Sequence, residues 1–140
     1  MQAALLEGRK ALPLCLPNPP VGCVLVQDDK IIARGHTQPP GQFHAEAMAL
    51  SQVSCDLSSI AAYVTLEPCS FQGRTPSCAQ ALVASGIKQV FVAMLDSDPR
   101  NAGTGIQILC DGGIEVSIGL LEQQARTDLE PYLLRNSSLS

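Results

Sequence analysis

The sequence predicts an α/β protein in which a mixed five-stranded sheet lies between two layers of helices, a three-layer α/β/α sandwich. After a short opening helix come two apolar strands joined by a tight polar turn, and strand and helix patterns then alternate to the end of the chain. Neither a repeat nor an interdomain linker interrupts this order. At 140 residues, with 46% apolar and 16% charged residues, the chain is expected to form one domain over residues 1–140.

Each element follows from the spacing of its apolar residues and from the residues that interrupt them. Apolar residues that recur every three or four positions predict helices, and alternating or continuous apolar runs predict strands. Asp28-Asp29-Lys30 marks a hairpin turn, and Gly86 and Gly112-Gly113 mark helix ends. The expected strands are 21–27, 31–35, 61–66, 88–95 and 114–118, and the expected helices are 2–12, 45–53, 77–85, 103–110 and 120–134, before a frayed tail at 136–140.

Several details of packing also follow from the pattern. Residues 88–95 are continuously apolar, which predicts a strand that is buried on both faces. Cys23, in a strand pattern, and Cys110, in a helical pattern, are expected in the core. Thr75 or Ser77 is expected to cap the helix that follows them.

Charge and hydropathy exclude some classes of partner. The net charge is −4, and the nine basic residues are scattered, whereas proteins that bind a nucleic-acid backbone display a basic patch. We therefore expect no nucleic-acid partner. No apolar run approaches the roughly 18 residues of a membrane span, so no membrane partner is expected either. Leu5-Leu6 lies beside Glu7, Arg9 and Lys10, which makes a poor signal peptide and predicts a cytoplasmic protein with reduced cysteines.

The candidate chemistry lies in His44-Ala45-Glu46, Pro68-Cys69 and Cys78. One imidazole and two thiolates supply three protein ligands and leave a fourth position open, which is typical of catalytic rather than structural zinc. Glu46 is placed to move protons for a water at that position. The zinc deaminases carry this H-x-E…P-C…C order, with a Glu that is not a ligand. The pattern therefore predicts hydrolytic removal of an amino group from a nitrogen heterocycle.

Simpler interpretations exist for each residue. His44 alone is more often an ordinary histidine than a ligand, each of the six cysteines is more often a small buried apolar residue, and Glu46 alone would be a solvated helix residue. The general signature has two residues between its cysteines, whereas eight intervene here. That gap indicates either no site or a subfamily with a longer loop. A structural zinc module remains a hypothesis, with Cys55 as its fourth ligand, and so does a catalytically inactive scaffold.

Four segments carry a resemblance to a known family: 18–24 (Asn-Pro-Pro-Val-Gly-Cys-Val), 44–46 (His-Ala-Glu), 65–70 (Thr-Leu-Glu-Pro-Cys-Ser) and 73–76 (Gly-Arg-Thr-Pro). The chain resembles the cytidine-deaminase superfamily and, within it, the pyrimidine deaminase domain of riboflavin biosynthesis. The likeness covers roughly residues 15–135, and the eight-residue gap between cysteines is normal for that subfamily.

The resemblance implies a cytidine deaminase-like fold, one Zn²⁺ held by His44, Cys69 and Cys78, and Glu46 acting as base and then as acid. It implies that the substrate is the diaminohydroxyphosphoribosylaminopyrimidine of riboflavin biosynthesis, with water as the second reactant. A homo-oligomer (dimer or tetramer) and a separate reductase are the implied protein partners. Substrate contacts are expected, with Arg74 near the phosphate, at Asn18, Thr37, Ala45, Phe71 and Arg74.

Other positions depart from the family pattern. Leu16-Pro17 precedes Asn18 where the family has Ser or Thr, and Thr37 and Phe71 stand where it commonly has His. The family's Asp-Pro-Asn-Pro reads Asp-Ser-Asp-Pro at 96–99. A paralogue that deaminates another ring (a secondary metabolite, a pterin or a nucleobase) therefore remains an alternative to the riboflavin precursor.

Two further alternatives concern partners and roles. A deaminase of tRNA or of single-stranded nucleic acid would carry a basic surface and the short cysteine spacing, and this chain has neither. Asp96 and Asp98 either hold a ribose hydroxyl or cap the helix that follows, and the sequence does not choose between these roles.

Overall fold

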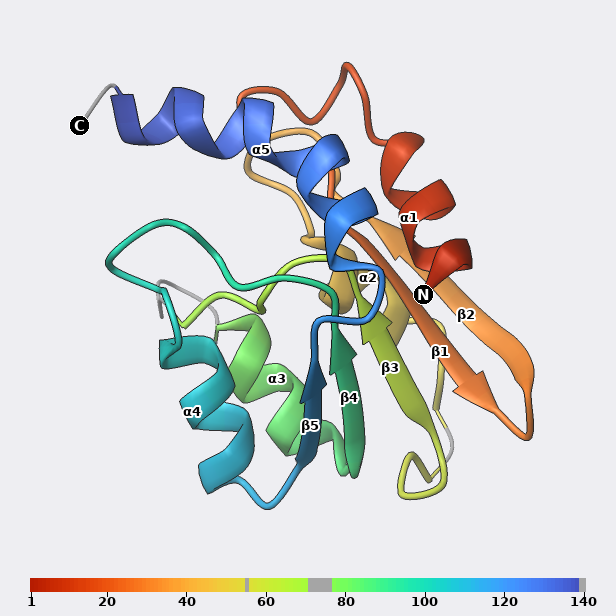
Figure 1. Cartoon of the computed structure of the whole chain (residues 1–140). Helices are drawn as coiled ribbons and strands as arrows, with labels where there is room; N and C mark the ends of the chain where they lie inside the picture. The colour runs from red at the N-terminus through yellow and green to blue at the C-terminus, as the bar shows by residue number, and fades with distance from the viewer. Residues whose placement is uncertain (55, 71–76, 139–140) are drawn as a thin grey trace.

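The computed structural model describes residues 1–54, 56–70 and 77–138, with side chains described as far as Leu133. Within these ranges an opening helix and hairpin are followed by alternating helices and strands (Figure 1). The strands are β1 (Gly22–Gln27), β2 (Lys30–His36), β3 (Ala61–Val64), β4 (Gln89–Val92) and β5 (Glu115–Ile118). The helices are α1 (Gln2–Arg9), α2 (Ala45–Leu50), α3 (Cys78–Ser85), α4 (Thr104–Asp111) and α5 (Glu122–Ser138).

The five strands form one mixed sheet in the order β2-β1-β3-β4-β5, which confirms the predicted fold class. β1 is antiparallel to both of its neighbours, whereas β3, β4 and β5 are parallel. In register, Cys23 lies opposite Val64, which lies opposite Val92. Residues in register share a face of the sheet, so these three point toward the same helical layer.

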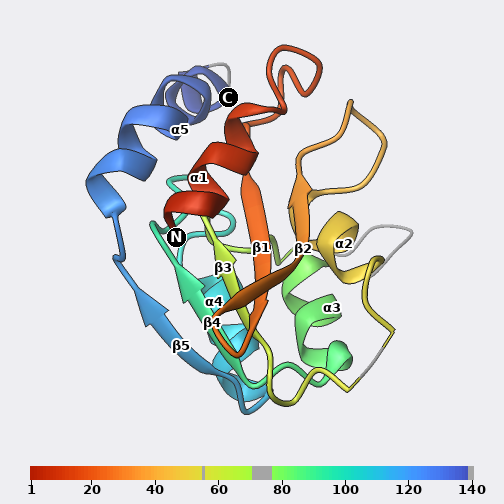
Figure 2. The same ribbon diagram turned by 90° about the vertical axis from the view of Figure 1, so that its right-hand side faces the viewer.

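The helices form the two outer layers of the sandwich. α2, α3 and α4 cover one face of the sheet, and α1 and α5 cover part of the other (Figures 1 and 2). The larger core lies between the sheet and the layer formed by α2, α3 and α4. Small and branched residues there let the helices approach the sheet closely. The helical members of this core include Ala45, Ala49, Ala79, Leu82 and Leu109. Within the described residues, none of the helices is long and apolar enough to cross a lipid bilayer.

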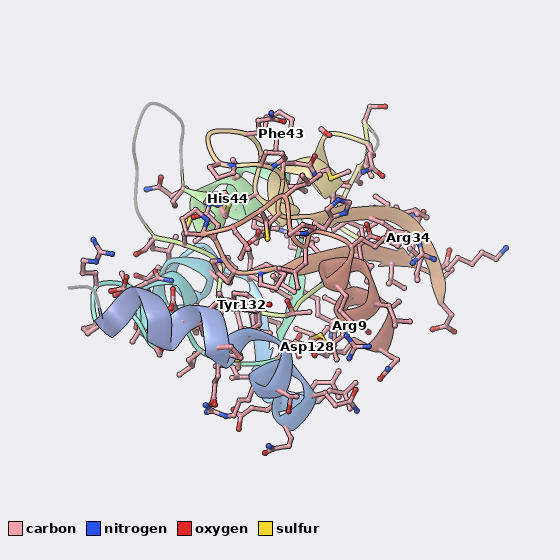
Figure 3. The ribbon with its side chains drawn as sticks, turned by 90° about the horizontal axis from the view of Figure 1, so that it is seen from above. Arg9, Arg34, Phe43, His44, Asp128 and Tyr132 are labelled. Carbon is pink, nitrogen blue, oxygen red and sulfur yellow. The ribbon has the colours of Figure 1, made fainter. Side chains whose placement is uncertain are left out.

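α5 crosses above the ends of β3 and β4 rather than lying flat on the sheet (Figure 1). A second core fills the space beneath it and beside α1, and it consists of Leu5, Leu66, Ala93, Met94, Ala125, Leu129 and Leu133. Arg9 at the end of α1 donates from Nε to Asp128 of α5 at 2.9 Å (Figure 3). The first and last helices are thus held together across the top of the sheet.

Local signals in the sequence account for two connections that place the site. Asp28 and Asp29 both have positive φ (51° and 63°), which two-residue hairpins require and which Asp tolerates. Ser77 caps α3, because its Oγ accepts from Gln80 N at 3.2 Å while Gln80 Oε1 accepts from Ser77 N at 3.3 Å. Gly86 ends α3 in the left-handed conformation, as predicted.

The prediction of a strand over 88–95 that is buried on both faces was wrong. β4 spans only Gln89–Val92, and its burial alternates. Val90 and Val92 are buried beneath α2–α4, whereas Phe91 is half-buried on the other face, beside Tyr63 with ring centroids 4.5 Å apart. The reason is that α1 and α5 leave part of that face uncovered (Figure 2).

Cys110 was also predicted wrongly. Cys23 and Cys15 are fully buried free thiols, but Cys110 is exposed. α4 packs through Leu109, and the next residue along a helix points about 100° away from it. Helix ends differ too: α2 stops at Leu50 rather than at residue 53, and α5 continues to Ser138 beyond the predicted end at residue 134.

Candidate metal centre and active-site pocket

The three predicted metal ligands come from three separate elements. His44 is the residue immediately before α2, Cys78 is the first residue of α3, and Cys69 lies in the loop after β3. The start of α3 also contacts that loop, because Cys78 N donates to Cys69 Sγ at 3.4 Å and Ala79 N donates to Cys69 O at 3.1 Å. A helix N-terminus favours the negative charge of a thiolate at this position.

The donor atoms have the spacing that zinc requires. His44 Nδ1 lies 3.3 Å from Cys78 Sγ and 3.8 Å from Cys69 Sγ, and all three atoms lie within 4.8 Å of one another. Zn–S bonds of about 2.3 Å and Zn–N bonds of about 2.0–2.1 Å at tetrahedral angles place N and S about 3.6 Å apart. Cys78 is buried, Cys69 half-buried and His44 exposed, so the group is closed on one side and open on the other.

Electrostatics also suit a cation at this group. The hydrogen bond from the Cys78 thiol, together with the hydrogen bond and charge of His44, outweighs the effect of burial and lowers the pKa of Cys69 to about 4. The same contact with Cys69, together with burial, raises the pKa of Cys78. Thiolate and imidazole are the donors that zinc prefers, so the side chains present fit this metal.

Glu46 lies in the first turn of α2 and is 4% exposed. Burial raises its pKa to about 7, and the charge on Cys69 acts in the same direction. Among the described residues, the group that can hold a metal is His44, Cys69 and Cys78, without Glu46. A buried carboxyl group near the ligands, with a pKa near neutrality, is suited to accept and return protons.

A cavity of about 540 Å³ opens beside this group, and its volume suits a small-molecule site. His44, Glu46 and Cys69 are among the residues that line it. The loop 96–100, which follows β4, contributes another part of the wall, and Leu133 of α5 contributes a further part. Figure 3 shows the His44 side of the molecule from above. The carboxyl ends of parallel strands meet here, which is where α/β sheets place ligands.

The structure brings three of the five predicted substrate contacts to this cavity: Asn18, Thr37 and Ala45 line it. The hydroxyl of Thr37 is already engaged, because it donates to Pro19 O at 2.9 Å and accepts from Val21 N at 3.0 Å. Through these two hydrogen bonds Thr37 also holds Pro19 and Val21, which line the cavity as well. Phe71 and Arg74, and with them Thr75 and Cys55, lie outside the described residues.

The structure of loop 96–100 excludes one of the two roles that the sequence left open for Asp96 and Asp98, the capping of the next helix. Neither Asp96 nor Asp98 supplies a side-chain cap to α4; Glu67 does so instead, by accepting from Gly103 N and Ile106 N. Asp98 accepts from the guanidinium of Arg100 at 2.7 and 3.1 Å, and Asp96 accepts from Asp98 N at 3.0 Å. Both carboxylates thus organise their own loop.

Sequence reasoning missed Glu67, Asn101 and Arg100 as parts of the site. Glu67 and Arg100 line the cavity, and Asn101 is fully buried beside it. The one available signal was that a Glu lies between a strand end and the Pro-Cys pair, at 67. Nothing in the sequence indicates that a residue 34 positions later packs against it.

The fold and the site define a class of protein: an α/β sandwich with one imidazole and two thiols that can hold a zinc ion, and a buried carboxyl group beside them. The family comparison agrees. Residues 1–94 match the model of the cytidine and deoxycytidylate deaminase zinc-binding region, and the chain belongs to this family.

More specific similarities lie with proteins of riboflavin biosynthesis. The chain is 42% identical to the riboflavin biosynthesis protein RibD of Chlamydia pneumoniae over 98% of its own length and 36% of that protein. It superposes on RibD of Acinetobacter baumannii with a TM-score of 0.91 and 45% identity, covering 98% of this chain and 39% of the other. A Thermotoga maritima structure superposes with a TM-score of 0.89 and 37% sequence identity, covering 97% of this chain and 40% of the other. That protein is described as a diaminohydroxyphosphoribosylaminopyrimidine deaminase/5-amino-6-(5-phosphoribosylamino)uracil reductase. The chain thus spans well under half the length of these relatives.

Proposed function

We propose that this protein is a zinc-dependent hydrolytic deaminase whose substrate is the diaminohydroxyphosphoribosylaminopyrimidine of riboflavin biosynthesis. The observation that carries the proposal is the placement of buried Glu46 beside His44, Cys69 and Cys78, with Glu46, His44 and Cys69 lining a cavity of about 540 Å³. The similarity to RibD proteins over nearly the whole chain supports the choice of substrate.

The chemistry follows from what these side chains can do. Zinc held by the two thiolates and the imidazole would acidify water at neutral pH and so supply the nucleophile. Glu46 would accept a proton from the attacking water and pass it to a ring nitrogen as the oxygen adds to the amino-bearing carbon. It would then accept the hydroxyl proton of that tetrahedral carbon and deliver it to the amino group, which leaves as ammonia while the carbonyl forms. A carboxylate serves both steps when its pKa lies near the working pH, and such a group contributes about 10²–10⁴-fold to the rate.

The cavity walls orient the ring for this attack. Asn18 offers both a donor and an acceptor at the cavity surface, and Ala45 places the start of α2 against the substrate. Arg100, in loop 96–100 at the cavity wall, and Arg74, which lies between the two cysteines in the sequence, are the cations that we assign to the phosphate. Arg100 would exchange part of its pairing with Asp98 for the phosphate oxygens.

The wider assignment includes organisation and compartment. We assign residues 1–140 to a single zinc-dependent deaminase domain that works as a homo-oligomer, with its product passed to a reductase. The reductase named in the Thermotoga maritima description supports the last point. A cytoplasmic location suits a site that needs two reduced cysteines, because cytosolic thiols stay reduced.

The test is ammonia release by the zinc-loaded protein, offered the riboflavin precursor beside a panel of free aminopyrimidines, pterins, cytidine and guanine. We expect turnover of the precursor, and loss of that turnover with zinc retained in Glu46→Gln. Turnover of another ring instead would establish the paralogue hypothesis and make Thr37 and Phe71 the first positions to examine for specificity. Normal turnover by Glu46→Gln would contradict the role given to Glu46.

A further inference from the structure

Two buried polar side chains connect the loop that carries Cys69 to the segment 96–106, and they take no part in the proposed chemistry. Glu67 is 3% exposed and Asn101 is fully buried. We propose that Glu67 and Asn101 are positioning residues that fix the loop carrying Cys69, and that they thereby set the zinc affinity of the site. The inference rests on the proposed zinc site but not on the proposed substrate.

Cys69 needs such support more than the other two ligands do. His44 adjoins α2 and Cys78 begins α3, so a helix fixes each of them. Cys69 lies in a loop, two residues beyond Glu67 and three beyond Leu66. A ligand on a loop keeps its position only if neighbouring backbone groups are held, because a loop has no repeating hydrogen bonds of its own.

Asn101 holds the backbone on both sides of Cys69. Its Oδ1 accepts from Ser70 N at 2.9 Å, and its Nδ2 donates to Pro68 O at 3.4 Å. The same Nδ2 donates to Asp96 Oδ2 at 3.2 Å, which extends the connection to the cavity wall. One buried amide thus joins the two peptide neighbours of the ligand to the loop 96–100.

Glu67 also connects the loop that carries Cys69 to the loop 96–100, and in addition to the start of α4. Its Oε1 accepts from Asp96 N and Gly103 N, both at 3.1 Å, and its Oε2 accepts from Ile106 N at 3.0 Å. Gly103 precedes α4 and has no side chain with which to cap it, so a carboxylate from a distant segment takes that role. Charge at a helix N-terminus and charge-assisted hydrogen bonds make this a strong attachment.

The start of α4 and the loop that carries Cys69 are also in close backbone contact. A Cβ added to Gly105 in α4 would overlap the carbonyl oxygen of Pro68 and come within 3.2 Å of Glu67 Cγ. The start of α4 therefore packs directly on the peptide that precedes Cys69. A substitution at Asn101 or Glu67 should therefore displace Cys69 Sγ. Loss of a residue that orients a ligand typically costs about 10–100-fold in metal affinity.

The experiment measures zinc affinity by competition with a chromophoric chelator, together with the thiolate-to-metal absorption of the Co²⁺-substituted protein. Asn101→Ala is compared with Gln107→Ala, which changes an exposed residue of the following helix α4 whose side-chain amide donates to Asp111 at 2.8 Å. We expect Asn101→Ala and Glu67→Gln to bind zinc about 10–100-fold more weakly and to alter the Co²⁺ spectrum. Gln107→Ala should match the unaltered chain.

A merely structural role would give a different result. If Asn101→Ala lowers the melting temperature but leaves zinc affinity and the Co²⁺ spectrum equal to those of Gln107→Ala, the proposal is overturned. Asn101→Asp serves if the alanine variant does not fold: it keeps the acceptor for Ser70 but cannot donate to Pro68, and we expect an intermediate loss of affinity. No substrate enters these measurements, so the expected affinities in a protein without turnover would overturn only the proposed function.

Discussion

Gly35 on β2 offers a direct test of how the sheet positions the catalytic helix. A Cβ at this position would overlap the carbonyl oxygen of Ala45 and lie 2.7 Å from Ala49 N, whereas real Cβ atoms essentially never come within 3.0 Å of such atoms. Both neighbours are backbone atoms of α2, so a change of rotamer cannot relieve the overlap. In Gly35→Ala, α2 must move away from the sheet.

The expected size of the effect follows from what α2 carries. Inserting a methyl group into a closely packed site costs about 1–3 kcal/mol of unfolding free energy. For a chain of this size each kcal/mol lowers the melting temperature by about 2–4 °C. The shift also moves His44 and Glu46 together relative to the two cysteines. Misplacement of a catalytic group by about 1 Å costs roughly 10²-fold in rate, so we expect a loss of that order in kcat.

The assay is ammonia release at saturating zinc, with the melting temperature recorded in parallel. Gly112→Ala is the matched control, because it adds the same methyl group against the Val83 side chain at 2.6 Å, and neither of these residues lines the cavity. We expect the control to lose some stability and keep its turnover. Unchanged turnover and zinc affinity in Gly35→Ala would refute the idea that this contact fixes the catalytic helix.

Three further predictions concern separate parts of the molecule. Glu46→Gln should keep zinc and fold but lose about 10²–10⁴-fold in kcat, measured as ammonia release; a loss below tenfold would remove the proton-transfer role. Burial raises the pKa of Glu7, but hydrogen bonds to His36 and Lys10 outweigh it and leave the pKa below its usual value. The stabilisation from ionised Glu7 should therefore be complete above about pH 4.3 and be lost as the pH falls through its lowered pKa. In urea unfolding, the unfolding free energies of the wild type and of Glu7→Gln should converge in acid. A difference in unfolding free energy that does not depend on pH would contradict this. Cys110 should react with a thiol reagent faster than the buried thiols of Cys15 and Cys23, and peptide mass spectrometry can measure the three rates. Equal rates would count against the exposure of Cys110.

The sequence predicted the parts of the fold that local chemistry decides. Two consecutive Asp residues tolerate positive φ and mark the hairpin at Asp28 and Asp29, and the Ser77–Gln80 capping box marks the start of α3. The grouping of the three candidate metal ligands, which the structure brings within reach of one ion, could be predicted for a related reason. His44 and Cys78 lie at helix starts, and a helix start fixes where its first side chains point.

What the sequence did not predict depends on contacts between distant segments. The exposure of Cys110 and the half-buried face at Phe91 depend on how far the outer helices extend across the sheet. The cap that Glu67 supplies to α4 joins residues 36 positions apart. Propensity and periodicity describe a single element at a time, so they contain no information about which loop lies beside which.

The origin of the three ligands in separate elements links metal supply to the lifetime of the folded chain. Only the assembled sheet brings His44, Cys69 and Cys78 within reach of one ion, so zinc selects the folded state over the unfolded one. Free zinc at a hundred times its dissociation constant adds about 2.7 kcal/mol to the folding free energy by mass action. A cell that runs short of zinc would therefore lose the protein itself to unfolding and proteolysis as well as its activity.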